Sequence, residues 1–137
     1  SCDATAGNEN IVSNNLIYNI NNNAQINAIY NSGSDGVKYL HNTIDLTSAT
    51  TTTSGNTYGV YQTTTATGLE FIGNIFNLSR TGSSNHAGFY FNTSTTVFTE
   101  NFNVVNVTSP TGIQEINKLN RVKLEEFFWD RVEKKLR

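Results

Sequence analysis

Ala28-Ile29-Tyr30, Gly59-Val60-Tyr61 and Gly88-Phe89-Tyr90 are three copies of one pattern, in which a small residue and an apolar residue precede a tyrosine. Each copy is followed by further apolar residues and then by an asparagine. The tyrosines lie 31 and 29 residues apart. A repeat of this length is typical of a solenoid, in which each turn packs against its neighbours along the chain. Solenoids of one shape serve as enzymes, adhesins and spacers, so the repeat predicts an architecture and leaves the activity open.

The composition predicts a body that is nearly all β. Charged residues make up 15% of the 137 residues, against about 25% in ordinary domains. Asparagine, serine and threonine take their place, and these side chains disfavour helix interiors but suit short strands and turns. The net charge is −2, which makes nucleic acid an unsuitable partner for the body. The sequence contains no long apolar stretch of the kind that forms a transmembrane helix.

Apolar residues alternate with polar ones within each copy, as in strands with one buried face. We expect the following residues to point into the coil: Val37, Tyr39, Ile44 and Leu46 in one turn, and Leu69, Phe71, Phe76 and Leu78 in the next. An earlier partial copy is formed by Ile11, Asn14, Leu16 and Tyr18, which brings the total to about four turns. The third copy departs from the pattern because Asn103 falls where Ile44 and Phe76 would lie. We expect a bulge or a shifted strand there.

The recurrent asparagines predict an internal ladder. Asparagine tolerates the left-handed backbone conformation of a sharp corner, and its amide can bond to the equivalent residue one turn away. We expect this ladder to consist of Asn14, Asn42, Asn74 and Asn101.

In these features the chain resembles the right-handed parallel β-helix repeat proteins, particularly the Asn- and Thr-rich secreted or surface-exposed repeats of bacteria. The resemblance covers roughly residues 10–113 and rests on apolar spacing and the recurrent asparagine. It implies a short right-handed parallel β-helix and an extracellular or cell-surface location, without implying a reaction. A β-sandwich remains the structural alternative, although it would need regular turn signals between adjacent strands.

The C-terminal segment differs in character from the rest. Residues 118–137 carry a net charge of +3 and residues 1–117 one of −5. Leu124, Phe128, Val132 and Leu136 recur at intervals of four, which predicts an amphipathic helix. We divide the chain into repeats over 1–117 and this helix over 118–137. The helix could cap the open end of the coil, dock on a partner, lie on a membrane surface or be an appended segment, and the open N-terminal end could mediate self-association.

Strand alternation places Tyr30, Tyr61 and Tyr90 on the outside of successive turns, as an aromatic stripe. Tyrosines along a surface offer apolar rings and hydroxyl groups to sugars, so these three are our candidate carbohydrate-binding residues. The alternative is a purely structural stack. Threonine clusters at 63–65 and 93–96 could order water as in ice-binding β-helices, but the first turn has no such cluster and solvated turns are the ordinary explanation.

The sequence offers no catalytic constellation and no metal site. Lys38 and Glu70 occupy equivalent positions on neighbouring turns and are expected to form a cross-strand salt bridge rather than a catalytic couple. We place His41 and Glu100 at equivalent positions two turns apart. The segment 31–36 has the oxygen ligands and glycines of a calcium loop but one carboxylate, and no other cofactor is suggested. Cys2 is the single cysteine, so an intrachain disulfide is excluded.

The sequence therefore favours a noncatalytic repeat module of a secreted or cell-surface protein that contacts polysaccharide or a cell-surface glycan. Two other interpretations stay open. One is a fragment of a β-helix polysaccharide lyase or glycosidase whose catalytic turns lie outside this chain or use Lys38, His41 and Glu70. The other is a structural segment of a fibre or tail spike.

Overall fold

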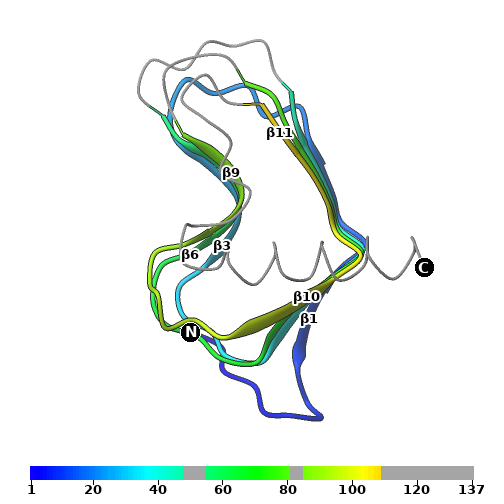
Figure 1. Cartoon of the computed structure of the whole chain (residues 1–137), viewed down its shortest axis with the longest axis vertical. Helices are drawn as coiled ribbons and strands as arrows, with labels where there is room; N and C mark the ends of the chain where they lie inside the picture. The colour runs from blue at the N-terminus through cyan, green and yellow to red at the C-terminus, as the bar shows by residue number, and fades with distance from the viewer. Residues whose placement is uncertain (48–54, 81–84, 109–137) are drawn as a thin grey trace, which may run out of the picture.

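The computed structural model describes residues 1–47, 55–80 and 85–108, and in these residues the chain is an all-β parallel solenoid (Figure 1). The strands are β1 (Asn10–Ser13), β2 (Leu16–Tyr18), β3 (Ile26–Asn31), β4 (Val37–Leu40), β5 (Thr43–Leu46), β6 (Thr57–Gln62), β7 (Leu69–Ile72), β8 (Ile75–Leu78), β9 (His86–Phe91), β10 (Phe98–Asn101) and β11 (Val104–Val107). The predicted class is confirmed. The C-terminal helix predicted over 118–137 lies outside the described residues.

Three parallel sheets form the walls of the coil, as Figure 1 shows in cross-section. Their strand orders are β1-β4-β7-β10, β2-β5-β8-β11 and β3-β6-β9. Every third strand along the chain therefore returns to the same wall one turn later. The solenoid has about three turns rather than the four we expected, because the third wall contains three strands in the part of the chain that is described.

The interior of the coil is filled by columns of apolar side chains that stack from turn to turn. The inward positions predicted from alternation are confirmed: Val37, Tyr39, Ile44, Leu46, Leu69, Phe71, Phe76 and Leu78 are each at most 4% exposed. The ring of Tyr39 lies on that of Phe71, with the ring centroids 4.8 Å apart and the planes 4° from parallel. Burial of this apolar surface is the main favourable contribution to the stability of the fold.

An asparagine ladder runs along the corner between the first and second walls. The side-chain oxygen of Asn74 accepts hydrogen bonds from both the backbone N–H and the Nδ2 of Asn42, each at 3.0 Å. Asn42 accepts the same pair of bonds from Asn15, and Asn103 accepts them from Asn74. The Nδ2 groups also donate to a strand carbonyl of the preceding turn, as Asn74 does to Tyr39 at 2.8 Å. The ladder thus satisfies backbone groups that the corner would leave unpaired.

The asparagine prediction was correct for Asn42 and Asn74 and wrong for the two ends. Asn15 and Asn103 are the ladder members, in place of Asn14 and Asn101. The structure also separates two tasks that we had assigned to one residue. The left-handed backbone belongs to the residue before each ladder asparagine, namely Asn14 (φ 56), His41 (φ 54), Gly73 (φ 64) and Phe102 (φ 56).

The bulge expected in the third copy is absent from β10 and β11. Phe98 pairs with Leu69, and Glu100 pairs with Phe71, in an unbroken register. Asn101 pairs with Ile72 in the same register. In this register Asn103 lies opposite Asn74, so its polar side chain occupies the ladder and not the core.

Replacing Asn74 by Leu should lower the free energy of unfolding by about 2–6 kcal/mol. The change removes the acceptor for the buried Asn42 N–H and the donor to the Tyr39 carbonyl, and each buried polar group without a partner costs about 1–3 kcal/mol. Urea denaturation followed by circular dichroism measures the loss. Asn77→Leu is the matched control, since Asn77 bonds to Asp45 and Asn106 on the outer face, and should cost about 1 kcal/mol or less. Equal costs for the two variants would contradict a special role for the ladder.

Candidate functional site

The third wall, β3-β6-β9, bends toward the interior of the coil (Figure 1). The small residues of the repeat, Ala28, Gly59 and Gly88, lie in the middle of its strands. A Cβ added to Gly59 would come within 2.4 Å of Phe76 Cδ1, and one added to Gly88 would come within 2.8 Å of Val105 Cγ1. The small residues therefore let this wall approach the second wall closely.

The bend also interrupts the alternation of side chains, so that two tyrosines of one strand face outward. Tyr58 and Tyr61 in β6 are three residues apart, and their rings stack with centroids 5.2 Å apart. Val60, between them, is 1% exposed and belongs to the core. Tyr58 was missed from the sequence because the equivalent positions of the other turns hold Asn27 and Ala87.

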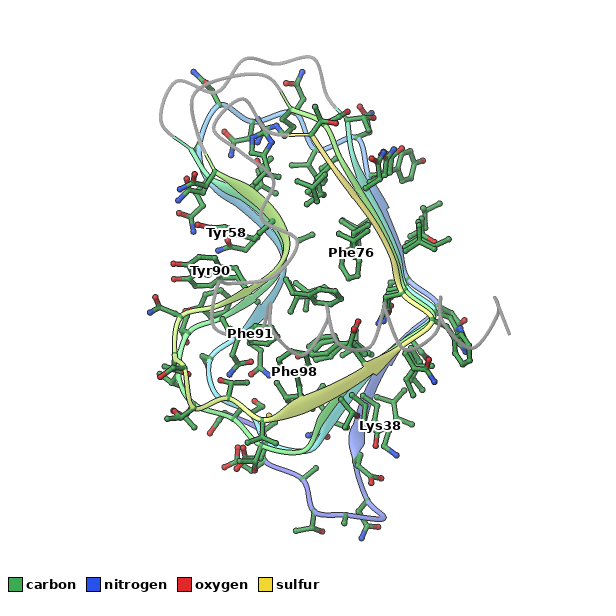
Figure 2. All side chains as sticks on the ribbon, viewed as in Figure 1. Lys38, Tyr58, Phe76, Tyr90, Phe91 and Phe98 are labelled. Atoms are coloured by element: carbon green, nitrogen blue, oxygen red, sulfur yellow. The ribbon has the colours of Figure 1, made fainter. Side chains whose placement is uncertain are left out.

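Tyr30, Tyr58, Tyr61 and Tyr90 form a tyrosine column on the outer side of the third wall. Tyr61 stacks on Tyr30 at 5.8 Å and on Tyr90 at 5.3 Å, with interplanar angles of 24° and 6°. Tyr58 stacks on Tyr90 at 4.5 Å. Figure 2 shows Tyr58 and Tyr90 outside this wall, and Phe76, Phe91 and Phe98 within the coil. The predicted outward stripe is confirmed, with one more tyrosine than we expected.

The members of the column differ in exposure, because Tyr58 is buried at 4% and Tyr61 and Tyr90 are half-buried. The faces of Tyr61 are covered by its neighbours, whereas Tyr30, at the N-terminal end, is 58% exposed. Burial, followed by the proximity of Tyr90 and Tyr61, raises the pKa of Tyr58 to about 12. The Tyr58 hydroxyl therefore stays protonated further into the alkaline range than an ordinary tyrosine hydroxyl.

Lys38, on the outer face of β4, is held between two carboxylates. Its Nζ is 3.4 Å from Glu9 Oε1 and 3.5 Å from Glu70 Oε1. Partial burial acts to lower the pKa of Lys38, but attraction to Glu70 and Glu9 outweighs it, and the pKa is raised. A lysine that stays protonated is a poor general base, so the geometry agrees with the expected cross-strand salt bridge.

The structure does not place His41 and Glu100 at equivalent positions, and this prediction was wrong. His41 lies at the corner, whereas Glu100 pairs with Phe71 in the first wall, which puts it in the column of Tyr39. Glu100 accepts a hydrogen bond from Nδ2 of Asn103 at 3.3 Å. Glu100 therefore belongs to the C-terminal end of the ladder and not to a catalytic pair.

The loop proposed for calcium uses its oxygen atoms for internal hydrogen bonds. Asn31 Oδ1 accepts from the backbone N–H groups of Gly33 and Ser34, and Asp35 Oδ1 accepts from the N–H and hydroxyl of Thr67. The described residues contain no group of three or more His, Cys, Asp or Glu side chains that could hold a metal ion. Calcium binding at 31–36 is thus given no support by the arrangement.

A buried polar cluster at the start of the third wall was not found from the sequence. Thr57 and His86 are register partners, and Arg80 Nη1 donates to Thr57 Oγ1 at 3.0 Å. Arg80 also donates to the carbonyl of Asn22, and His86 Nδ1 donates to the carbonyl of Thr108 at 3.1 Å. Arg80 is 2% exposed and His86 is 0% exposed. No carboxylate within the described part of the chain forms a salt bridge with Arg80.

Comparison with known proteins gives no assignment: no family model, no curated protein and no solved structure matches this chain. Among the described residues there is also no helix of the length and hydrophobicity needed to cross a membrane.

The stability of the chain should fall as the pH falls below about 6.5. Burial lowers the pKa of His86 from 6.5; the Thr108 hydrogen bond opposes this effect and Arg80 adds to it. The native state then binds fewer protons than the unfolded state, so acid favours unfolding, with a slope of at most about 1.4 kcal/mol per pH unit for one group. Melting temperatures at pH 7.5 and 5.5 measure this loss. His86→Phe should flatten the dependence, whereas His41→Asn, at an exposed corner, should retain it; the reverse pattern would refute the assignment.

Proposed function

We propose that the chain is a noncatalytic β-solenoid module of a secreted or cell-surface protein, and that it binds carbohydrate along the tyrosine column. The observation that carries the proposal is the stack of Tyr30, Tyr58, Tyr61 and Tyr90 on the outer side of the third wall. Hydroxyl groups repeated along the solenoid axis match a repeating polymer better than they match a small compact ligand. Ring edges add apolar contact beside each hydroxyl.

The rest of the surface supports a binding role more than catalysis. The one lysine among the described residues is paired with two carboxylates, which makes the alternative of a polysaccharide-cleaving site at Lys38, His41 and Glu70 less suitable. The surface is polar but carries few charges, with 15% charged residues in the whole chain. Neutral glycans are recognised mainly by hydrogen bonds and aromatic contacts, so such a surface suits them.

Mutual stacking of the tyrosines favours one second candidate, a structural segment of a fibre or tail spike. Aromatic pairs of this kind contribute about 0.5–1.5 kcal/mol each beyond the area that they bury. A column whose rings cover one another would then stabilise the coil without binding anything. The two candidates differ in the role of the tyrosine hydroxyl groups, which contribute to glycan binding in the first candidate and are not needed in the second.

The double variant Tyr61→Phe/Tyr90→Phe should lower retention on a glycan array about tenfold with little change in the melting temperature. It removes two hydroxyl groups, each worth about 0.5–1.5 kcal/mol as a hydrogen-bonding group, and keeps both rings in the stack. Tyr18→Phe is the matched control, because Tyr18 is 62% exposed and lies on the second wall. Retention that is unchanged in the double variant, or no retention by the unmodified chain, would favour the structural candidate.

A further inference from the structure

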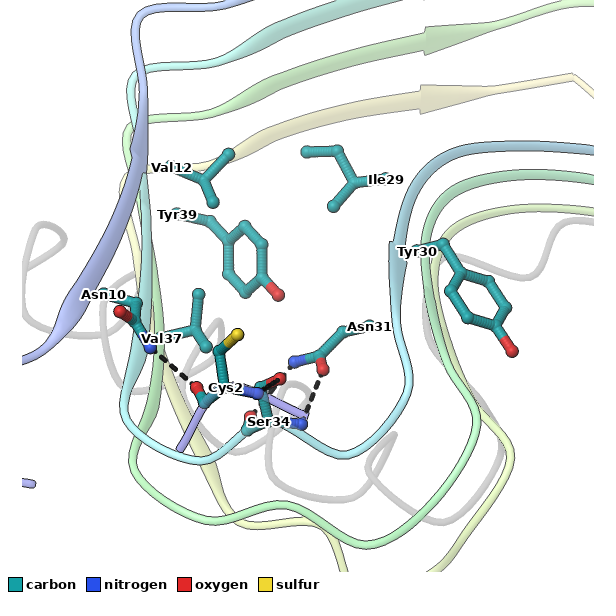
Figure 3. A pocket seen from close by; sticks show the side chains of 9 residues that line it. All are labelled: Cys2, Asn10, Val12, Ile29, Tyr30, Asn31, Ser34, Val37 and Tyr39. Atoms are coloured by element: carbon teal, nitrogen blue, oxygen red, sulfur yellow. Dashed lines mark hydrogen bonds between the residues drawn. The ribbon is translucent and has the colours of Figure 1, made fainter. Parts of the chain in front are cut away.

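No strand among the described residues covers the N-terminal end of the coil, and the surface there is largely apolar. A cavity of about 210 Å³ lies there between β1, β3 and β4 (Figure 3). Its lining includes Val12, Ile29, Tyr30, Val37 and Tyr39. An opening into the core of a solenoid, flanked by unpaired strand edges, is a surface on which another strand-forming chain can assemble.

The core columns are incompletely covered at this end. Val12, Ile17 and Ile29 are half-buried, although each begins a column of the hydrophobic core. The residues stacked on them one turn later are Tyr39, Ile44 and Val60, with exposed fractions of 3%, 0% and 1%. A preceding turn therefore accounts for the lower exposure of Tyr39, Ile44 and Val60, and no strand in the described part of the chain precedes the first turn in the same way.

The hydrogen bonds of the asparagine ladder all run in one direction along the solenoid axis, from each turn to the following one. Each ladder asparagine donates to the next turn and accepts from the preceding one, as Asn42 donates to Asn74 and accepts from Asn15. No described residue donates to Oδ1 of Asn15. Its Nδ2 donates to the nearby Ser13 carbonyl at 3.1 Å, whereas Asn42 Nδ2 donates to the Val12 carbonyl one turn before. Asn15 Oδ1 can therefore accept hydrogen bonds from the backbone N–H and the Nδ2 of an asparagine on a preceding parallel turn, as Asn42 Oδ1 does from Asn15.

Part of such a turn is already present. The N–H of Ala4 donates to the Asp35 carbonyl at 3.1 Å, just as the N–H of Gly36 donates to the Thr67 carbonyl at 2.9 Å one turn later. Asp3 Oδ1 accepts from the N–H of Asp35 at 3.2 Å. The turn-to-turn pairing of the body thus continues past the first turn at this corner, with the same spacing and direction.

We propose that the N-terminal end is an assembly surface for one further parallel β-solenoid turn. In the added turn, an asparagine donates to Asn15 Oδ1 and apolar side chains cover Val12, Ile17 and Ile29. An aromatic residue of the added turn, at the position equivalent to Tyr30, extends the tyrosine column. The proposal concerns the end of the coil and is independent of carbohydrate binding by the outer edges of that column.

A lengthened chain tests the proposal directly. A second copy of residues 4–35 is inserted before Ala4 in the full chain, so that the inserted turn precedes the first one in register. The unfolding equilibrium constant in water should fall more than about tenfold, because each added turn contributes a nearest-neighbour interface, and the urea m value should rise with the buried area. The control is the same insertion with its residues in scrambled order, which should change neither quantity.

The substitution Asn15→Leu, made in the original sequence and not in the inserted copy, tests whether the added turn docks through the asparagine ladder or stabilises the chain in some other way. In the unmodified chain this position is exposed, so the substitution should raise the unfolding equilibrium constant less than about threefold. In the lengthened chain it should raise the constant more than about tenfold, because the ladder would then be broken at a buried rung.

Two results would overturn the proposal. One is an inserted copy that is digested by protease as fast as the scrambled insertion, with an unchanged m value. The other is a dimer of the unmodified chain in sedimentation that is lost in Val12→Lys, because a second copy would then occupy the end in place of a parallel turn.

Discussion

The corner between the first and second walls is the constraint on which the rest of the solenoid depends. The chain turns there within a few residues, through a left-handed residue such as His41, and the following asparagine turns inward. A sharp corner leaves N–H and C=O groups without strand partners, and burying them unpaired would cost free energy at every turn. The carboxamides of Asn42 and Asn74, each 1% exposed, bond to those groups and to each other. Because the same bond recurs turn after turn, the ladder fixes the register in which the core columns stack.

The tyrosine column is a consequence of the third wall approaching the second. Gly59 and Gly88 allow that approach, since a Cβ on either would collide with the facing core. The bend then directs both Tyr58 and Tyr61 outward, where they stack. The small residue and the tyrosine of the repeat are thus parts of one arrangement: the first sets the shape of the wall and the second covers its outer side.

Much of the fold follows from the sequence because alternation and repetition are strong signals. They predicted the parallel solenoid, the inward residues and the outward tyrosines. They failed where the signal was shared by neighbours: Asn14 and Asn15 are adjacent, and Asn101 and Asn103 are close, so spacing alone did not identify which asparagine enters the ladder. The buried pair of Arg80 and His86 could not be foreseen, because each occurs in one turn and their partners are brought together by the fold.

The most direct test of this account is amide hydrogen exchange of the asparagine side chains, followed by nuclear magnetic resonance on the labelled full chain. The account predicts that the Nδ2 protons of Asn42 and Asn74 exchange far more slowly than those of the exposed Asn8 and Asn23, and that they are released only by unfolding of the coil. Exchange of Asn42 and Asn74 at the rate of Asn23 would show that the ladder does not hold the turns in register.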